Sequence, residues 1–263
     1  MRPYLSLVKI RFLALLQYRA AALAGVGTQL FWGLIRVMIF RGFYASAVNH
    51  IPMTRSDTMT YIWLGQTFFL LIPWNIDKEI ISVIRTGNVA YEIVRPLDCY
   101  WYWFAKSLAF RTAPLMIRSI PLFLIAIPFL GMGLPPDIFS FTAFLISLIF
   151  AIILSSTITL LTTISLFRTI SGEGIQRLVP SFMFFFCGLI VPLPLLPQWL
   201  QTTMAILPFR GIVDNPFRLY IGHIPYTDLP FILLHQVVWI IFFIVTGRFL
   251  LSRGLKRITI QGG

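Results

Sequence analysis

The sequence is poor in charge, and this alone excludes most classes of soluble protein. Only 11% of its 263 residues are charged and 58% are hydrophobic, whereas soluble domains carry about 25% charged residues. A single soluble core cannot hide so much apolar surface. Several apolar runs also exceed the roughly 20 residues that cross a bilayer, so the composition predicts an integral membrane protein.

Groups for catalysis and for metal or nucleotide binding are also scarce. No glycine is followed by lysine, which excludes the phosphate-cradling G-x-x-x-x-G-K-[ST] loop of an ATPase. His50, His223 and His235 are scattered, and neither an H-E-x-x-H motif nor an acidic cluster occurs, so metal-ligand spacing is missing. We expect no catalytic, cofactor-binding or metal site in this chain, and no enzyme activity.

Acidic residues are outnumbered by basic ones, 9 against 21, giving a formal net charge of +12. Nucleic-acid binding would need these cations clustered on a solvated surface, but they lie at the ends of apolar segments. That placement is typical of residues that fix orientation and contact anionic lipid head groups. We therefore predict membrane lipids, and not nucleic acid, as their partners.

The long apolar runs predict an all-α integral membrane protein that forms a single domain over residues 1–263. Each run is separated from the next by a polar or proline-rich segment. The six transmembrane helices are predicted over residues of about 20–44, 57–75, 114–130, 139–167, 178–193 and 229–251.

Two further segments are apolar, but their sequences do not predict transmembrane helices. Residues 3–18 carry Lys9 and Arg11 within the apolar pattern, which favours a helix lying in the membrane interface. Prolines interrupt residues 197–228, so we expect a re-entrant or interfacial helical hairpin before the last crossing.

The distribution of lysine and arginine predicts the orientation. With six crossings both termini lie on one side, which would carry 15 basic residues against 4 on the other. By the positive-inside rule both termini are then cytoplasmic. The side of the termini holds Arg2, Lys9, Arg11, Arg19, Lys78, Arg85, Arg95, Lys106, Arg111, Arg168, Arg177, Arg248, Arg253, Lys256 and Arg257.

A charged segment over residues 76–98 follows the second predicted crossing and belongs in water. If residues 76–86 form a helix, its apolar side chains share one face and Gly87 follows where helices commonly end. Such a helix could dock into a partner or lie on the inner leaflet, and periodicity does not separate the two. The residues proposed for docking are Ile76, Asp77, Lys78, Glu79, Ile80, Val83, Ile84, Arg85 and Gly87.

Two arginines lie inside predicted crossings, Arg36 in the first and Arg118 in the third. A charge at the bilayer centre costs roughly 2.5–3.5 kcal/mol on insertion scales. Each arginine is therefore a candidate for a substrate path, or else it snorkels to the nearest head groups.

Several different short motifs lie in a defined order along the chain. They are Ile84-Arg85-Thr86-Gly87-Asn88, Val94-Arg95-Pro96-Leu97-Asp98, Leu207-Pro208-Phe209-Arg210 with Asn215-Pro216, and Arg253-Gly254-Leu255-Lys256-Arg257. With this order relative to six crossings, the chain resembles the permease subunits of type-2 ABC exporters, specifically a little-characterised bacterial subgroup. The resemblance covers essentially the whole chain, although none of the motifs is a catalytic signature.

The resemblance implies a permease in the bacterial inner (plasma) membrane, with an interfacial helix, a cytoplasmic coupling helix and re-entrant helices. It also implies a second permease chain, identical or a sister, and two separate ATPase subunits that hold ATP and Mg²⁺. The segment from Ile76 to Gly87 would contact the ATPase, with Arg168, Glu173 and Arg177 as a secondary contact. The expected activity is export of an amphiphilic or hydrophobic substrate. A stand-alone carrier or lipid flippase is the alternative, and a membrane-embedded enzyme ranks below it.

Overall fold

The computed structural model describes residues 2–15, 17, 19–46, 51–74, 76–167 and 173–256, without the side chains of residues 2, 19–22 and 173. Every regular element within these ranges is helical. The α-helices are α1 (Arg2–Leu15), α2 (Arg19–Ser46), α3 (Arg55–Thr67), α4 (Lys78–Arg85), α5 (Val89–Ile93), α6 (Cys99–Phe129), α7 (Ile138–Ile164), α8 (Glu173–Phe186), α9 (Gln198–Ile206), α10 (Asp214–Tyr220) and α11 (Leu229–Leu255). The 3₁₀ helices are η1 (Phe69–Leu71), η2 (Ser165–Phe167), η3 (Leu193–Leu195), η4 (Pro208–Gly211) and η5 (Tyr226–Asp228).

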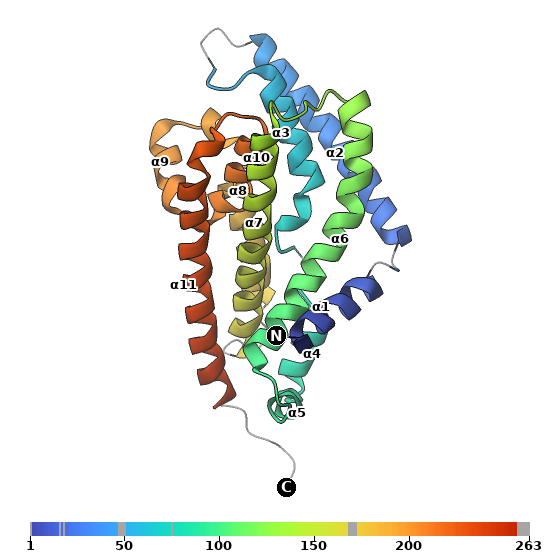
Figure 1. Ribbon diagram of the computed structural model, residues 1–263, viewed down its shortest axis with the longest axis vertical. Helices are drawn as coiled ribbons and strands as arrows, with labels where there is room; N and C mark the ends of the chain where they lie inside the picture. The colour runs from blue at the N-terminus through green and yellow to red at the C-terminus, as the bar shows by residue number, and fades with distance from the viewer. Residues whose placement is uncertain are drawn as a thin grey trace.

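Four of the described helical stretches are long and apolar enough to cross a membrane. They cover Leu23–Ser46, Cys99–Phe129, Ile138–Phe167 and Tyr226–Leu255, and they run along the length of the molecule (Figure 1). Three of them coincide with the first, fourth and sixth predicted crossings. At the second and fifth, α3 and α8 have only 13 and 14 residues, fewer than the roughly 20 that span a bilayer.

Helix α3 is surrounded by protein. All residues from Thr58 to Thr67 are buried, and the indole N–H of Trp63 donates to the carbonyl of Leu130 at 3.1 Å. Thr54 caps the start of the helix by accepting from the amide of Asp57. A helix that is buried on every side is shielded from lipid, so it can be shorter than one that faces hydrocarbon.

The end of α3 leaves backbone carbonyls buried among other helices, where an unpaired carbonyl would cost free energy. Side chains of α6 and α7 satisfy them. Arg111 donates to the carbonyls of Leu70 and Ile72 at 2.9 and 3.0 Å, and the hydroxyl of Ser155 donates to the carbonyl of Leu71. The sequence placed Arg111 at the cytoplasmic surface. Its side chain is instead 5% exposed, and it stabilises the irregular backbone after α3.

Helix α6 begins well before the predicted crossing at Pro114. Asp98 caps its start by accepting from the amide of Trp101, and Pro114, Pro121 and Pro128 all lie inside the helix. The orientation count placed Lys106 on the side of the termini, before the third predicted crossing. Lys106 is nevertheless 2% exposed, since carboxylates of other helices pair with it.

The expected interruption over residues 197–228 is present as the short elements α9, η4, α10 and η5. These elements lie at the end of the molecule where α11 begins (Figure 1). Gln236 of α11 holds them to the long helices, because its amide donates to the carbonyls of Ser147 at 3.0 Å and Gly211 at 2.7 Å.

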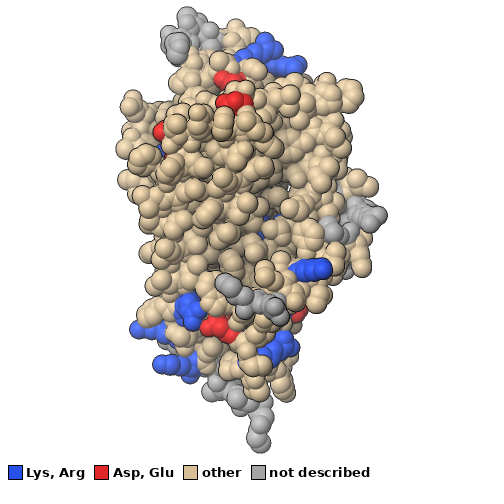
Figure 2. Space-filling view, viewed as in Figure 1, with Lys and Arg blue, Asp and Glu red and all other residues tan. Residues whose placement is uncertain are grey.

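Charged side chains gather at the two ends of the face shown in Figure 2, and the band between them is largely free of charge. Exposed hydrophobic residues, among them Trp32, Met38, Leu124 and Val245, lie on the long helices. This distribution suits a molecule whose middle is solvated by lipid. The fold therefore defines a multi-pass membrane protein.

Candidate coupling site

The helix expected over residues 76–86 is present as α4, Lys78–Arg85. Asp77 caps its start, with its carboxylate accepting from the amide of Glu79 at 3.0 Å. Gly87 follows with a φ of +73°, a left-handed conformation that costs a side-chain-bearing residue about 1–2 kcal/mol. The glycine lets the chain turn directly into α5 (Figure 1).

The apolar face of α4 packs into this chain's own core. Ile80 is 2% exposed and lies in a cluster with Val89, Trp103, Ile164 and Leu251, which brings α4 and α5 against the ends of α6, α7 and α11. Val83 and Ile84 are partly buried against the same cluster. Ile80 was predicted from the sequence as a contact for a partner; in this conformation its side chain is instead buried within its own chain.

Charged side chains join α4 to α1 and α6. Arg11 of α1 pairs with Asp77 at 2.6 Å and with Glu79. Lys106 of α6 pairs with Glu79 at 2.7 Å and with Glu92 of α5 at 3.5 Å. These five residues, which we call the α4 ion network, connect four helices.

The α4 ion network extends to aromatic side chains of α6. The indole N–H of Trp103 donates to the second carboxylate oxygen of Glu92, and the ammonium of Lys106 lies 4.7 Å from the ring centre of Tyr102. Sequence reasoning missed Arg11, Glu92, Trp103 and Lys106 because their partners lie far away along the chain. The only local signal for this network was the large number of charged and aromatic residues near them in the sequence.

The solvent-facing part of this region carries both charge and apolar surface. Lys78 and Arg85 are exposed on α4. Beyond them Tyr91, Ile93 and Val94 are exposed by 76%, 49% and 84%. The exposed apolar side chains therefore lie on and just after α5, not on the face of α4 that the periodicity singled out.

The secondary contact proposed at Arg168, Glu173 and Arg177 is described only in part. Arg168 and the side chain of Glu173 lie outside the described residues, and Arg177 is exposed on α8. Phe167, just before this segment, stacks on Trp103 with ring centres 6.1 Å apart. Phe167 therefore lies against Trp103, which binds Glu92 of the α4 ion network.

Arg36 and Arg118 make separate contacts. Arg36 of α2 donates to the carbonyl of Ile190, after α8, at 2.7 Å. The guanidinium of Arg118 covers Gly25 of α2, where a Cβ would approach its Cζ to 2.4 Å. Arg118 also lines a cavity of about 110 Å³ together with Arg111. Among the described residues, no interaction joins Arg36 to Arg118.

The described residues hold no cluster of three or more His, Cys, Asp or Glu side chains that could bind a metal ion. The chemistry of the α4 region is thus that of ion pairing and packing. An arrangement of this kind can hold helices together and pass on their movement, but it has no evident group that activates a substrate.

The comparison with protein families agrees with this description. The family model described as "ABC-2 type transporter" matches residues 4–215, and the chain therefore belongs to this family. A comparison with curated proteins finds no match. The protein is thus a membrane component of an ABC transporter, a permease and not a catalytic domain.

Proposed function

We propose that this permease exports an amphiphilic or hydrophobic substrate from the bacterial cytoplasm, powered by separate ATPase subunits. Membership of the ABC-2 family implies partnership with such subunits. The observation that carries the coupling role is the α4 ion network. Because Lys106 and Arg11 tie α4 to α6 and α1, a displacement of α4 by a partner is passed to a long helix and to the N-terminal helix together.

The ATPase in this proposal docks on the exposed side of α4 and α5. Lys78 and Arg85 supply charge there, and Tyr91 and Val94 supply apolar area. The buried Ile80 anchors α4 instead of meeting the partner. ATP and Mg²⁺ bind to the ATPase subunits, and this chain holds no cofactor. Arg168, Glu173 and Arg177 form the secondary contact.

The membrane arrangement we propose has six crossings. Helices α2, α6, α7 and α11 cross outright. Helix α3 with η1 crosses within the protein interior, and α8, which exposes Leu178, Phe182 and Phe185, supplies the remaining crossing at the protein surface. Helix α1 lies in the interface, α4 is cytoplasmic, and α9 with α10 forms a re-entrant hairpin. The excess of basic residues on the side of the termini supports a cytoplasmic location for both, in the inner membrane.

A second permease chain, identical or a sister, completes the transporter in this proposal together with two ATPase subunits. Helix α2 exposes Phe31, Trp32, Met38 and Ile39, which face either lipid or the second permease. Differential contacts with two ATPase states would drive alternating access or lateral extrusion between the permeases. Arg36 and Arg118 then face the substrate path or snorkel.

Purification from the native membrane tests the proposal. We expect a stoichiometric ATPase subunit to accompany the tagged full-length chain. Val94→Asp should lower the recovered ATPase by about tenfold, as expected for a charge placed in an apolar interface. Leu134→Asp is the matched control, because Leu134 is 70% exposed and belongs to the α6–α7 connection at the opposite end (Figure 1).

Two results would contradict the proposal. One is substrate transport by this chain alone in liposomes, which would favour a stand-alone carrier or flippase. The other is recovery of ATPase with Val94→Asp and Leu134→Asp to the same extent, which would remove α5 from the docking surface. Both variants lie at exposed positions, where substitutions rarely change stability by more than about 0.5 kcal/mol.

A further inference from the structure

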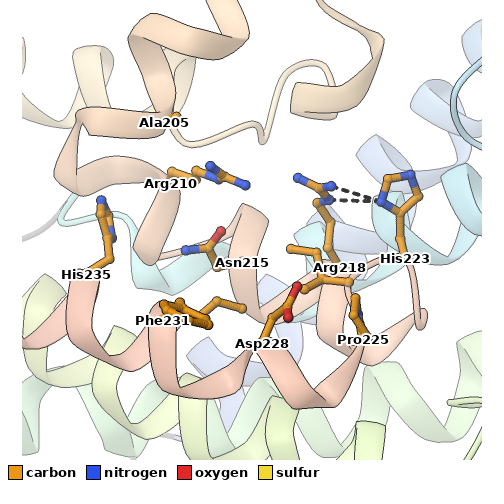
Figure 3. A pocket seen from close by; sticks show the side chains of 11 residues that line it. Ala205, Arg210, Asn215, Arg218, His223, Pro225, Asp228, Phe231 and His235 are labelled. Atoms are coloured by element: carbon orange, nitrogen blue, oxygen red, sulfur yellow. Dashed lines mark hydrogen bonds between the residues drawn. The ribbon is translucent and has the colours of Figure 1, made fainter.

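A cavity of about 650 Å³ lies between α9, α10 and the start of α11, at the end of the molecule opposite α4 (Figure 1). Polar side chains from several of these elements line it (Figure 3). They are Arg210, Asn215, Arg218, His223, Asp228 and His235. Arg210 and Asn215 belong to motifs named above, but none of the six had an expected role in binding.

Positive charge exceeds negative charge in the buried part of this cavity. The carboxylate of Asp214 is fully buried and pairs with Arg210 at 3.4 Å and with Arg218 at 3.3 Å. One carboxylate thus serves two guanidinium groups. Asp228 lines the same cavity but is exposed, so water screens its charge.

Arg218 is held firmly in place. Its Nε and Nη2 lie 3.1 and 3.0 Å from Nδ1 of His223, the contacts drawn in Figure 3. The other ring nitrogen of His223 lies 3.3 Å from the carbonyl of Pro52. A guanidinium fixed in this way binds a ligand with a smaller loss of conformational entropy.

Arg210 and Asn215 keep unused hydrogen-bonding capacity. The Nε of Arg210 faces Asp214 at ion-pair distance but makes no hydrogen bond, and the Oδ1 of Asn215 is buried without one; Asn215 is 4% exposed. In Figure 3 the amide of Asn215 is drawn between Arg210 and Phe231. An unsatisfied buried polar atom costs about 1–3 kcal/mol, and a ligand that pairs with it removes that cost.

The opposite wall of the cavity is apolar. Phe231 and Ile232 of α11 line it, and Phe231 is 74% exposed. Ala205, Arg210 and Arg218 also border a neighbouring cavity of about 210 Å³. The arginine pair therefore lies between two hollows that open beside an apolar helix.

We propose that this cavity binds the anionic headgroup of an amphiphile, a phosphate or carboxylate that also carries a hydrogen-bond donor. Arg210 and Arg218 bind the anion, since guanidinium groups form strong charge-assisted bonds with phosphate and carboxylate. Oδ1 of Asn215 accepts from a hydroxyl or amine of the headgroup. The apolar chain of the ligand leaves along Phe231.

The inference rests on the proposed function in one respect, because it places an anionic amphiphile at the far end of the export path. The binding itself can be measured without ATPase or transport. Absence of an ATPase partner would overturn the proposed function but would not affect the anion site. Absence of anion binding would overturn the anion site but would not affect the proposed function.

Calorimetric titration of the purified full-length chain in a neutral detergent tests the site. Dihexanoyl phosphatidylglycerol has an anionic phosphate and two hydroxyl donors, whereas dihexanoyl phosphatidylcholine has no net charge and no donor. We expect the phosphatidylglycerol to bind at least about tenfold more tightly. Inorganic phosphate should bind at least about tenfold more weakly than phosphatidylglycerol, because it lacks the apolar chain.

Variants locate the binding in this cavity. Arg210→Gln should weaken phosphatidylglycerol binding by about tenfold or more, while Arg55→Gln, an exposed arginine of α3 outside the cavity lining, should leave it within about twofold. Ala205→Trp places an indole at a residue that borders both cavities and keeps the Asp214 ion pairs. It should also weaken phosphatidylglycerol binding, and it provides a second test if Arg210→Gln fails to fold.

Equal affinity for the two lipids in the unmodified protein would overturn the proposal. Unchanged phosphatidylglycerol binding in folded Arg210→Gln or Ala205→Trp would also overturn it. Inorganic phosphate binding as tightly as the lipid would show a free-anion site and reject the amphiphile.

Discussion

The α4 end and the α10 end of the molecule both bury charged side chains, yet they satisfy them differently. At the α4 end, Arg11 and Lys106 pair with three carboxylates from α4, α5 and the residue before α4. At the α10 end, two guanidinium groups share Asp214 and border a cavity of about 650 Å³. The first group of charges is satisfied within the chain, and the second is not.

This difference separates two uses of buried charge in one helical protein. A network satisfied by its own helices joins them into one body, which is what transmission of force requires. A cationic cavity with unpaired donors and acceptors has capacity left for a ligand. Variants at each end can break or sharpen this distinction.

Lys106→Met should have the largest effect, because it leaves Glu92, 7% exposed, without its cation. Breaking a buried ion pair from one side costs roughly 3–5 kcal/mol, so we expect a clearly lower midpoint of thermal unfolding in detergent. Lys78→Met, at an exposed lysine of α4, is the control and should change the midpoint little. An unchanged midpoint in Lys106→Met would mean that the α4 ion network does not hold α4 in place.

Asp214→Asn should have the second largest effect on stability. It removes the carboxylate that pairs with Arg210 and Arg218 and that accepts from the hydroxyl of Tyr61 in α3. We expect a loss of about 1–3 kcal/mol, smaller than for Lys106→Met because both arginines can be hydrated from the cavity. Unfolding by denaturant measures it, with Asp228→Asn as the control. A loss greater than that of Lys106→Met would reverse the comparison.

Gly87→Ala tests how rigidly α4 connects to α5. The φ of +73° at Gly87 favours glycine, although nothing lies within 4 Å of a Cβ built there. We expect a cost of about 1 kcal/mol from backbone strain alone. Gly27→Ala in α2 has equal space and helical backbone, so it should be neutral or stabilising. Equal unfolding midpoints for the two variants would contradict this assignment.

Asp137→Asn should have the smallest effect. The hydrogen bond from the Ser140 amide at the start of α7 lowers the pKa of the Asp137 carboxyl, so the charged form stabilises the fold above the unfolded pKa of about 3.9. That contribution disappears as pH falls through the lower folded pKa. The difference in unfolding midpoint between wild type and Asp137→Asn should therefore shrink below about pH 4. A constant difference from pH 7 to pH 3 would exclude the charge as its cause.

Local patterns predicted part of this fold well. The apolar runs that became α2, α7 and α11 exceed the length of a bilayer, and the turn at Gly87 follows from its position after an amphipathic stretch. The pattern failed for α6, where charges and Pro114 suggested a later start. It also failed to predict how short α3 and α8 are. For α3 the reason is burial by neighbouring helices, which removes the length requirement that lipid imposes; the exposed side of α8 has no such explanation.

The candidate sites were predicted less completely. The α4 helix was expected from periodicity, but the direction of its apolar face was not, since an amphipathic helix can turn that face to a partner or to its own chain. Arg111 of α6 binds the carbonyls of Leu70 and Ile72, and Asp214 is shared by two arginines. Neither interaction can be predicted from the neighbouring sequence. Each depends on residues that lie far away in the sequence.

The sequence by itself determined that this chain enters a membrane, that it lacks the motif for ATP hydrolysis, and which motifs place it among transporter permeases. These properties follow from composition and short-range order, which do not depend on how the helices pack. Only the tertiary structure decided that Lys106 and Arg111 are interior residues, that Ile80 faces inward, and that Arg210 and Arg218 border one cavity. Pairing between distant side chains decides whether a charge can be buried, and that pairing exists only after the helices have assembled.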